Sequence, residues 1–228
     1  MTEVLADLDA GVLRLSRSRL MDLASVAGTG NTESVDEEGL KALEDAGLVS
    51  EGTANPAVEL VGLTVFEPLA GLRLEIADRV RRVAATGWIG PELSVLAIPE
   101  GDGLEEIKAC PTGFLPARLA GYLSLGPRRH QPGSALVEKL HLDAATDTTG
   151  IADRIRAALR LRWRVTVSWK TGSRSLEVID AGEEGLWIAE EEGELLRING
   201  ATATEVWVRL LSLLPKAEEL EPASAGLG

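Results

Sequence analysis

The residues best suited to acid-base or metal chemistry in this sequence are two histidines, His130 and His141. His130 follows two arginines in a segment rich in glycine and proline, and His141 lies close to Asp143 in the stretch LHLD. The two histidines are not at the spacing that metal ligands adopt on one helix or hairpin, so no histidine metal centre is predicted. We expect His130 to be an exposed loop residue and His141 to be a strand residue without a catalytic role.

The single cysteine, Cys110, excludes an intramolecular disulfide and a site with several cysteine ligands. A lone cysteine among apolar residues is typical of a small core side chain. No GxSxG, Walker or HExxH pattern occurs in the sequence. Gly28-Thr-Gly30 lacks the preceding strand and third glycine of a phosphate-binding loop, so it indicates a linker. We therefore predict no metal and no cofactor.

Carboxylates are plentiful, but the groups Glu183-Glu184 and Glu190–Glu192 fall at predicted hairpin tips, where acidic residues mainly increase solubility. General acid-base catalysis needs burial or a paired group to shift a pKa. One enzymatic alternative stays open, in which Glu177 and Asp180 work together in a cleft. By subtraction, a binding protein is favoured over an enzyme, and no catalytic residue is predicted.

The chain has 228 residues, of which 45% are hydrophobic and 26% charged, as in an ordinary globular protein. This length suits one large domain or two small fused ones, and we expect one. No segment reaches the roughly 18 apolar residues that span a bilayer. The first residues, MTEVLADLDAG, lack the basic start and apolar core of a secretory signal. The predicted location is the cytoplasm, without membrane insertion.

The formal net charge of −13 disfavours nucleic acid and anionic lipid as partners, because both require a concentrated cationic surface. Arginines do cluster in two places. We interpret both clusters as solvated faces that pair with carboxylates. Their members are Arg79, Arg81 and Arg82, and then Arg154, Arg156, Arg160, Arg162 and Arg164.

Periodicity and capping signals predict helices and strands along most of the chain. The expected helices cover residues 17–27, 34–47 behind a Ser34–Glu37 capping box, 55–66, 111–125, 151–161 and about 202–214. The expected strands cover residues 11–15, 72–80, 93–98, 105–109, 163–169, 176–179, 186–188 and 195–198, with turns near Thr86-Gly87 and over 100–103. Residues 134–148 are not assigned.

The second half of the chain restates the first: LSLGP, starting at Leu123, recurs as LSLLP, starting at Leu211. We predict an α+β domain over 1–228 with two quasi-repeats, 11–127 and 134–215, and a flexible tail over 216–228. Each repeat is expected to be an antiparallel meander that ends in a helix. Paired edge to edge, the repeats would form a pseudo-twofold central antiparallel sheet flanked by helices packed on one face.

Several segments carry a resemblance to a known family. They are LKALEDAGLV over 40–49, the helix that starts at Asn55-Pro56, CPTGFLPARLA over 110–120 with LSLGPR, SLEVIDAGEEGLW over 175–187, and INGATATEVWVRLLSLLP at the end. In this order they resemble the EspG-type proteins of actinobacterial type VII secretion, over Leu15 to Pro215.

The resemblance implies a cytosolic, non-catalytic chaperone that binds a helical secretion substrate. It also implies that the substrate docks on a loop over residues 82–90 and on the C-terminal helix. The partner-binding residues that follow from it are Arg82, Val83, Trp88, Ile89, Val206, Arg209 and Leu213. The alternatives are another interaction module, such as an immunity or scaffold protein, or a homodimer formed through an exposed sheet edge.

The five tryptophans are an unusual share against one tyrosine and two phenylalanines, and tryptophan is favoured at the centres of protein interfaces. Trp163 and Trp169 share a strand face with apolar neighbours, and Trp207 lies on an apolar helical face, so these three are expected in the core. Trp88 stands in GWIGP, a turn context. We predict Trp88 as the exposed anchor for a partner.

Overall fold

The computed structural model describes residues 3–138 and 150–220. These residues form seven α-helices and thirteen strands, eleven of which belong to one sheet in the order β1-β2-β8-β7-β6-β5-β10-β11-β12-β13-β9. The registered strand pairs are antiparallel, which confirms the predicted α+β class. The chain divides into two compact units, Met1–Leu72 with Ala84–Leu115, and Arg73–Val83 with Pro116–Gly228.

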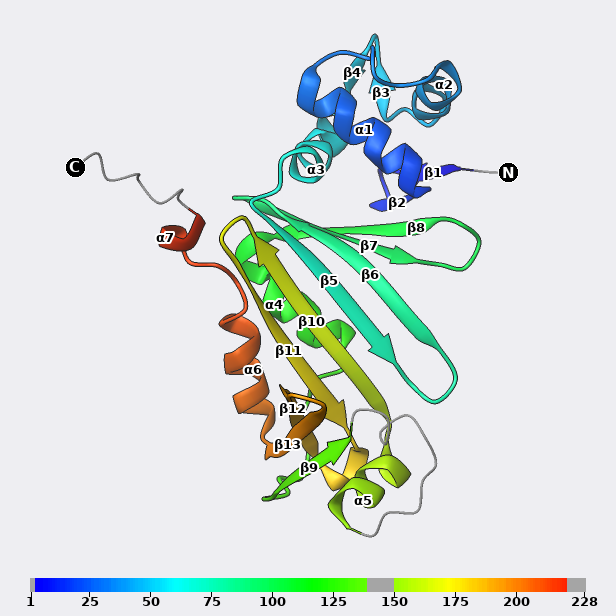
Figure 1. Ribbon diagram of the computed structural model, residues 1–228. Coiled ribbons are helices and arrows are strands. Elements are labelled where there is room, and N and C mark those ends of the chain that lie inside the picture. The colour runs from blue at the N-terminus through cyan, green and yellow to red at the C-terminus, as the bar shows by residue number, and fades with distance from the viewer. Residues whose placement is uncertain (1–2, 139–149, 221–228) are drawn as a thin grey trace, which may run out of the picture. The chain divides into compact units, whose positions relative to one another are not determined.

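The first unit combines three helices with one end of the strand order (Figure 1). Its helices are α1 (Arg17–Thr29), α2 (Glu37–Asp45) and α3 (Pro56–Phe66). Its strands are β1 (Val4–Asp7), β2 (Val12–Leu15), the small hairpin β3 (Val49–Ser50) and β4 (Thr53–Ala54), β7 (Leu93–Pro99) and β8 (Glu105–Pro111). Strands β5 (Ala70–Ala77) and β6 (Arg82–Ile89) contribute residues to both units.

The core of the first unit lies between these helices and the strands β2, β7 and β8. Leu20 and Leu23 of α1 and Val61 of α3 pack there with Val95 and Ile107 of the sheet. The predicted apolar spacing of the helices therefore marks the faces that are buried.

Side-chain caps set where the helices of the first unit begin. Ser16 accepts a hydrogen bond from the N–H of Arg19, and Asn55 accepts one from Ala57 ahead of Pro56. The start of α2 was predicted wrongly, because Asp36 and not Ser34 is its N-cap and accepts from Gly39 at 2.6 Å. A carboxylate serves this position as well as a hydroxyl does, and Asp36 stands two residues after Ser34.

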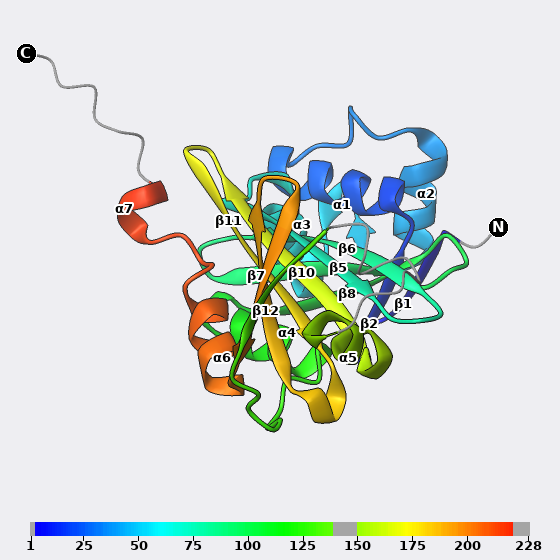
Figure 2. The same cartoon turned by 60° about the horizontal axis from the view of Figure 1, so that its bottom comes forward.

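The second unit contains the rest of the sheet and four helices (Figures 1 and 2). A 3-10 turn over Thr112–Phe114 leads into α4 (Leu115–Tyr122), followed by β9 (Ser134–Glu138) and α5 (Ile151–Ala158). Then come β10 (Leu161–Trp169), β11 (Gly172–Asp180), a 3-10 turn over Gly182–Glu184, β12 (Leu186–Glu192), β13 (Leu195–Ala201), α6 (Ala203–Leu211) and α7 (Ala217–Leu220).

Helices cover both faces of the sheet in this unit, so the expectation of helices on one face is wrong. On one face Ile155 of α5 packs with Ile179 and Trp187. On the other, α6 lies against β11, and Arg174 of β11 donates to the carbonyl of Leu214 at 3.0 Å. The five residues at the end of β11 are all buried, as expected of a strand covered on both sides.

The turn predicted at Thr86-Gly87 is wrong, because β6 runs through it and the chain turns at Asp78–Arg81 instead. Gly87 is required for packing. A Cβ at Gly87 would lie 2.8 Å from the side chain of Leu96, so the glycine marks a close approach inside the sheet. Strand β1 and the β3–β4 hairpin were not predicted.

The order of elements from α3 through β5–β8 to α4 matches the order from α5 through β10–β13 to α6. The pseudo-twofold relation between the two halves remains a prediction, as does their membership of one domain.

The tail predicted over 216–228 begins with α7, where Thr171 donates to the carbonyl of Glu219 at 3.0 Å. His141, with the rest of the unassigned stretch from 139 on, lies outside the described residues, whereas 134–138 form β9.

Candidate partner-binding surface

Helix α6, which holds Val206 and Arg209 and is followed by Leu213, has a well-defined start. Thr202 accepts a hydrogen bond from the N–H of Glu205 at 3.1 Å, and the Glu205 carboxylate accepts one from the N–H of Thr202 at 2.6 Å. The helix was expected to start at about residue 202, and its capping box with Glu205 was not predicted. The hydrogen bond from the Thr202 N–H lowers the pKa of Glu205, followed by the bond from the Thr202 hydroxyl.

The inner and outer faces of α6 separate the predicted residues. Val206 and Leu213 are buried, so neither belongs to the exposed surface of the folded chain, and their contact with a partner remains a prediction. Arg209 is exposed, and its neighbours Val208 and Leu211 are 57% and 46% exposed. We call Val208, Arg209 and Leu211 the α6 surface. The 3.6-residue period of the helix separates 206 from 208 and could have identified this outer face.

A groove of about 370 Å³ adjoins the α6 surface through Arg209. It lies where the paired stretch of β11 and β12 ends, at Glu177 opposite Ala189. Beyond that point the β10–β11 and β12–β13 hairpins diverge toward their tips (Figure 2). Its lining consists of Arg164, Ser175, Leu176, Glu177, Ile188, Ala189, Glu190, Glu191 and Arg209.

Ion pairs occupy the polar groups of the groove. The buried Glu177 accepts hydrogen bonds from Arg162 at 2.6 Å and from Arg164 at 2.9 Å. Burial lowers the pKa of Arg164, but its hydrogen bond to Glu177 and then its pairing with Glu191 leave the pKa raised overall. Arg209 pairs with Glu190 at 2.6 Å. In these contacts the charges of the arginines and of the carboxylates that line the groove offset each other.

The enzymatic alternative required Glu177 and Asp180 in one cleft, and the structure places them apart. Because side chains alternate along a strand, these two residues of β11 point to opposite faces of the sheet. Asp180 is buried against Arg128, at 2.8 Å, and accepts a further bond from the N–H of Gly182. Within the described residues, no group of three or more histidine, cysteine or acidic side chains could hold a metal ion.

The four partner-binding residues predicted on a loop lie instead on strand β6. Ile89 is buried, and Trp88 is half-buried against the core of the first unit. The guanidinium of Arg17 stacks on the Trp88 ring, 5.0 Å from its centroid, and pairs with Glu105 at 2.7 Å. Trp88 was expected to be an exposed turn residue, and this is wrong because β6 runs through Gly87 and Trp88; its contact with a partner remains a prediction.

Arg82 and Val83 follow the turn between β5 and β6, Asp78–Arg81, which we call the β5–β6 tip. The Asp78 carboxylate accepts from the N–H groups of Val80 and Arg81, both at 2.8 Å, and these bonds lower the pKa of Asp78. Arg79 donates to the carbonyls of Ala157 and Leu159 at the end of α5. Val80 is almost fully exposed, whereas the sequence predicted it as part of a half-buried strand over 72–80.

The remaining tryptophans are placed as follows. Trp163 is buried, as predicted. Trp169 and Trp207 are half-buried, and Arg174 stacks on Trp169 at 5.1 Å from its centroid. Trp187, which drew no prediction, is buried and donates to the carbonyl of Glu184 at 2.8 Å.

The other predicted reactive groups stand as expected where the structure describes them. Cys110 is buried and His130 is exposed. Arginines of both clusters pair with carboxylates, as in Arg81 with Asp78 at 3.1 Å and Arg156 with Asp153 at 2.8 Å, whereas Arg79 donates to backbone carbonyls. These arginines therefore belong to a salt-bridged surface.

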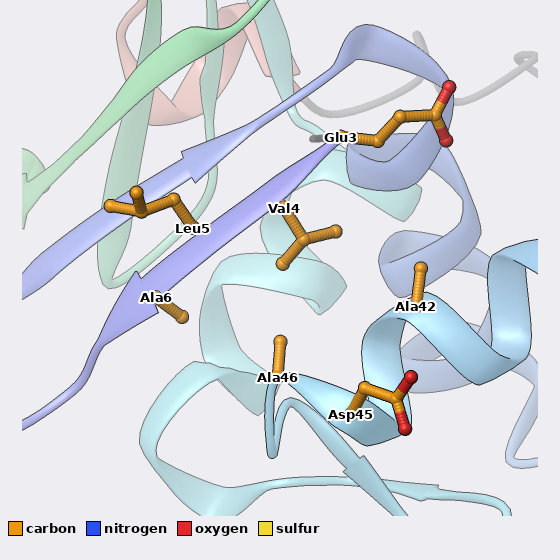
Figure 3. A pocket seen from close by; sticks show the side chains of 7 residues that line it. All are labelled: Glu3, Val4, Leu5, Ala6, Ala42, Asp45 and Ala46. Carbon is orange, nitrogen blue, oxygen red and sulfur yellow. The ribbon is translucent and has the colours of Figure 1, made fainter. Parts of the chain in front are cut away.

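A second groove, of about 420 Å³, lies between β1 and α2 in the first unit (Figure 3). Its floor is apolar, with Val4 and Ala46, and the carboxylates of Glu3 and Asp45 stand at its rim. Glu3 pairs with Arg19 at 2.6 Å, and Asp45 with Lys41 at 2.9 Å. The rim charges are thus engaged within the unit.

The fold is that of an EspG-type chaperone. It is similar to the solved structure of the Mycobacterium tuberculosis type VII secretion system chaperone EspG5 in complex with a PE25-PPE41 dimer, with a TM-score of 0.58 and 11% sequence identity, covering 90% of this chain and 97% of that one. At this identity the likeness establishes the fold. No protein-family model matches the sequence, and no curated protein matches it either. None of the described helices has the length and apolar content to cross a membrane.

Proposed function

We propose that this chain is a cytoplasmic, non-catalytic chaperone of a type VII secretion system that binds a helical segment of a secreted protein. The observation that carries the proposal is the fold likeness over 90% of the chain to a chaperone solved with a substrate dimer. A fold alone carries function poorly, so the proposal also relies on the surfaces that this chain presents.

The α6 surface is the proposed docking place for the substrate helix. Val208 and Leu211 stand one turn apart on an exposed helical face, which is the spacing that a second helix meets when side-chain ridges pack into grooves. Arg209 stands beside this pair on the helix and is available to exchange its partner Glu190 for an acidic group of the substrate. Val206 and Leu213 contribute by holding α6 in place.

The β5–β6 tip is the second proposed contact, with Arg82 and Val83 following the exposed Val80. The two hydrogen bonds to Asp78 preorganise this turn, which reduces the entropy lost on binding. Trp88 and Ile89 support β6 from within the sheet.

A non-catalytic role is supported by the buried carboxylates. Glu177 and Asp180 each form ion pairs with arginines and point to opposite faces of β11, so they do not form the paired carboxylates that the enzymatic alternative requires.

The experiment that tests the proposal is tagged purification from the native host at modest salt, followed by mass spectrometry of what stays bound through gel filtration. We expect a stoichiometric helical protein encoded beside a type VII secretion system. The double variant Val208→Ser/Leu211→Ser should lose this protein, and the matched control Leu5→Ser, an exposed leucine of the first unit, should retain it. Recovery of the chain alone or as a homodimer would contradict the proposal.

A further inference from the structure

Helix α3 carries an unpartnered apolar stripe on its solvent side. Leu60, Leu63, Phe66 and the following Leu69 recur every three residues and are 43%, 39%, 46% and 42% exposed. Glu59 is the single charged residue of the helix, so α3 is apolar all round. Such a helix is normally buried on all sides. We call these four side chains the α3 stripe.

The α3 stripe cannot turn inward, because the opposite side of the helix is already packed. Val58, Val61 and Val65 belong to the core of the first unit. Gly62 lets α1 approach closely, since a Cβ at Gly62 would lie 2.6 Å from the Cβ of Ala27. The exposed side is therefore a fixed surface of the folded unit.

Phe66 is held in place at the end of α3 by the glycine beneath it. A Cβ at Gly28 of α1 would overlap the Phe66 ring, so the ring lies directly over the α1 backbone. About half of the ring still faces solvent. An aromatic side chain fixed before binding loses little entropy on contact and makes a good anchor.

The charged residues in the segment that contains the α3 stripe are acidic. Residues 42–72 contain five carboxylates and neither lysine nor arginine. Glu59 and Glu67 are both exposed, and they stand just before and just after the stretch from Leu60 to Phe66. The complementary ligand thus combines an apolar stripe with cationic flanks.

We propose that the α3 stripe binds an amphipathic α-helix of a partner protein, one whose apolar residues are flanked by lysine and arginine. A ridge of side chains three apart packs into the groove of a second helix at a shallow angle. A second copy of this chain fits poorly. In an antiparallel α3 pair centred on Leu63, Glu59 of one copy would face Glu67 of the other, and each copy carries a net charge of −13.

The test uses a fluorescent synthetic helix of about 18 residues with a leucine stripe and lysine flanks, long enough to be partly helical in water. A matched peptide carries glutamate flanks. Fluorescence anisotropy should show the lysine peptide binding the whole chain at least about tenfold more tightly than the glutamate peptide, and Leu63→Gln should weaken it by about tenfold. Leu136→Gln, on the exposed part of β9, is the matched control and should change nothing.

The charge swap Glu59→Lys/Glu67→Lys lies outside the packed side of α3 and should reverse the preference between the two peptides. No binding of either peptide, equal binding of both, or unchanged binding by Leu63→Gln would overturn the proposal. A dimer in light scattering that dissociates in Leu63→Gln would assign the stripe to a second copy and also overturn it. The variant Val208→Ser/Leu211→Ser should bind the lysine peptide normally, so this result is independent of the proposed chaperone function.

Discussion

Asp180 at the end of β11 accepts two hydrogen bonds from the guanidinium of Arg128, at 2.8 Å and 3.2 Å. Arg128 lies in the glycine- and proline-rich segment after α4, between the two predicted repeats. The pair fixes this segment to the sheet and raises the pKa of Arg128, chiefly through the hydrogen bond to Asp180.

Loss of the Arg128 side chain should therefore destabilise the fold. Arg128→Ala leaves the buried Asp180 charge without its bidentate partner, and we expect the free energy of unfolding to fall by about 3 kcal/mol. Urea denaturation measures this change. The adjacent exposed Arg129 is the matched control, and Arg129→Ala should change stability by less than about 0.5 kcal/mol. Equal losses of unfolding free energy in the two variants would show that the ion pair does not contribute to stability.

The capping box of α6 predicts a second stability change. Thr202→Ala removes the acceptor for the N–H of Glu205 and should cost about 1 kcal/mol in thermal or urea unfolding. Thr204→Ala, on the exposed first turn of the same helix, is the control and should be close to neutral. If Thr202→Ala leaves the stability unchanged, packing alone determines where α6 starts.

Glu205 predicts a pH dependence of the same helix. Its pKa is lower in the folded chain than in the unfolded chain, so its stabilising effect is present above the unfolded value and disappears as pH falls through the folded value. Stability of the wild type should thus decline in this acidic range more than that of Glu205→Gln. Parallel pH profiles of the two proteins would contradict the assignment.

Helical glycines should respond to alanine in opposite ways. Nothing lies within 4 Å of a Cβ added at Gly121 of α4, so Gly121→Ala should stabilise the protein by about 0.5 kcal/mol through helix propensity. In α2 a Cβ at Gly39 would overlap the guanidinium of Arg19, which is buried among Glu3 and Asp22. Gly39→Ala should destabilise, and melting temperatures of the two variants give the comparison. A stabilised Gly39→Ala would show that Arg19 moves freely.

Trp88→Ala should affect stability and not partner capture. The ring packs on the core of the first unit and under Arg17, so its loss should cost about 2–3 kcal/mol. Binding of a purified substrate by the folded fraction should stay within about twofold of wild type. If the variant folds but binds the substrate much more weakly, Trp88 contacts the partner and this prediction is wrong.

Local signals predicted the helices well because their caps and stops are short-range. Asn55-Pro56 and Thr202 mark helix starts that the structure confirms. Strand β6 was misassigned because a glycine that turns a chain and a glycine that admits Leu96 to close contact look alike in sequence.

The candidate surface was only partly predictable, because exposure depends on which face of an element is covered. Val206 and Arg209 are equally plausible contacts in sequence, yet the sheet beneath α6 buries the first and leaves the second outside. Asp180 pairs with Arg128, which is distant in sequence, so no local pattern predicts this ion pair.

The arrangement of Glu177 and Asp180 on opposite faces of β11 also constrains how that strand can assemble. A shift of one position during folding would exchange the two faces, moving Glu177 away from Arg162 and Arg164 and carrying Asp180 away from Arg128. Each misaligned state would bury an uncompensated carboxylate. The two ion-paired sites thus favour the native register of β11 over registers shifted by one residue.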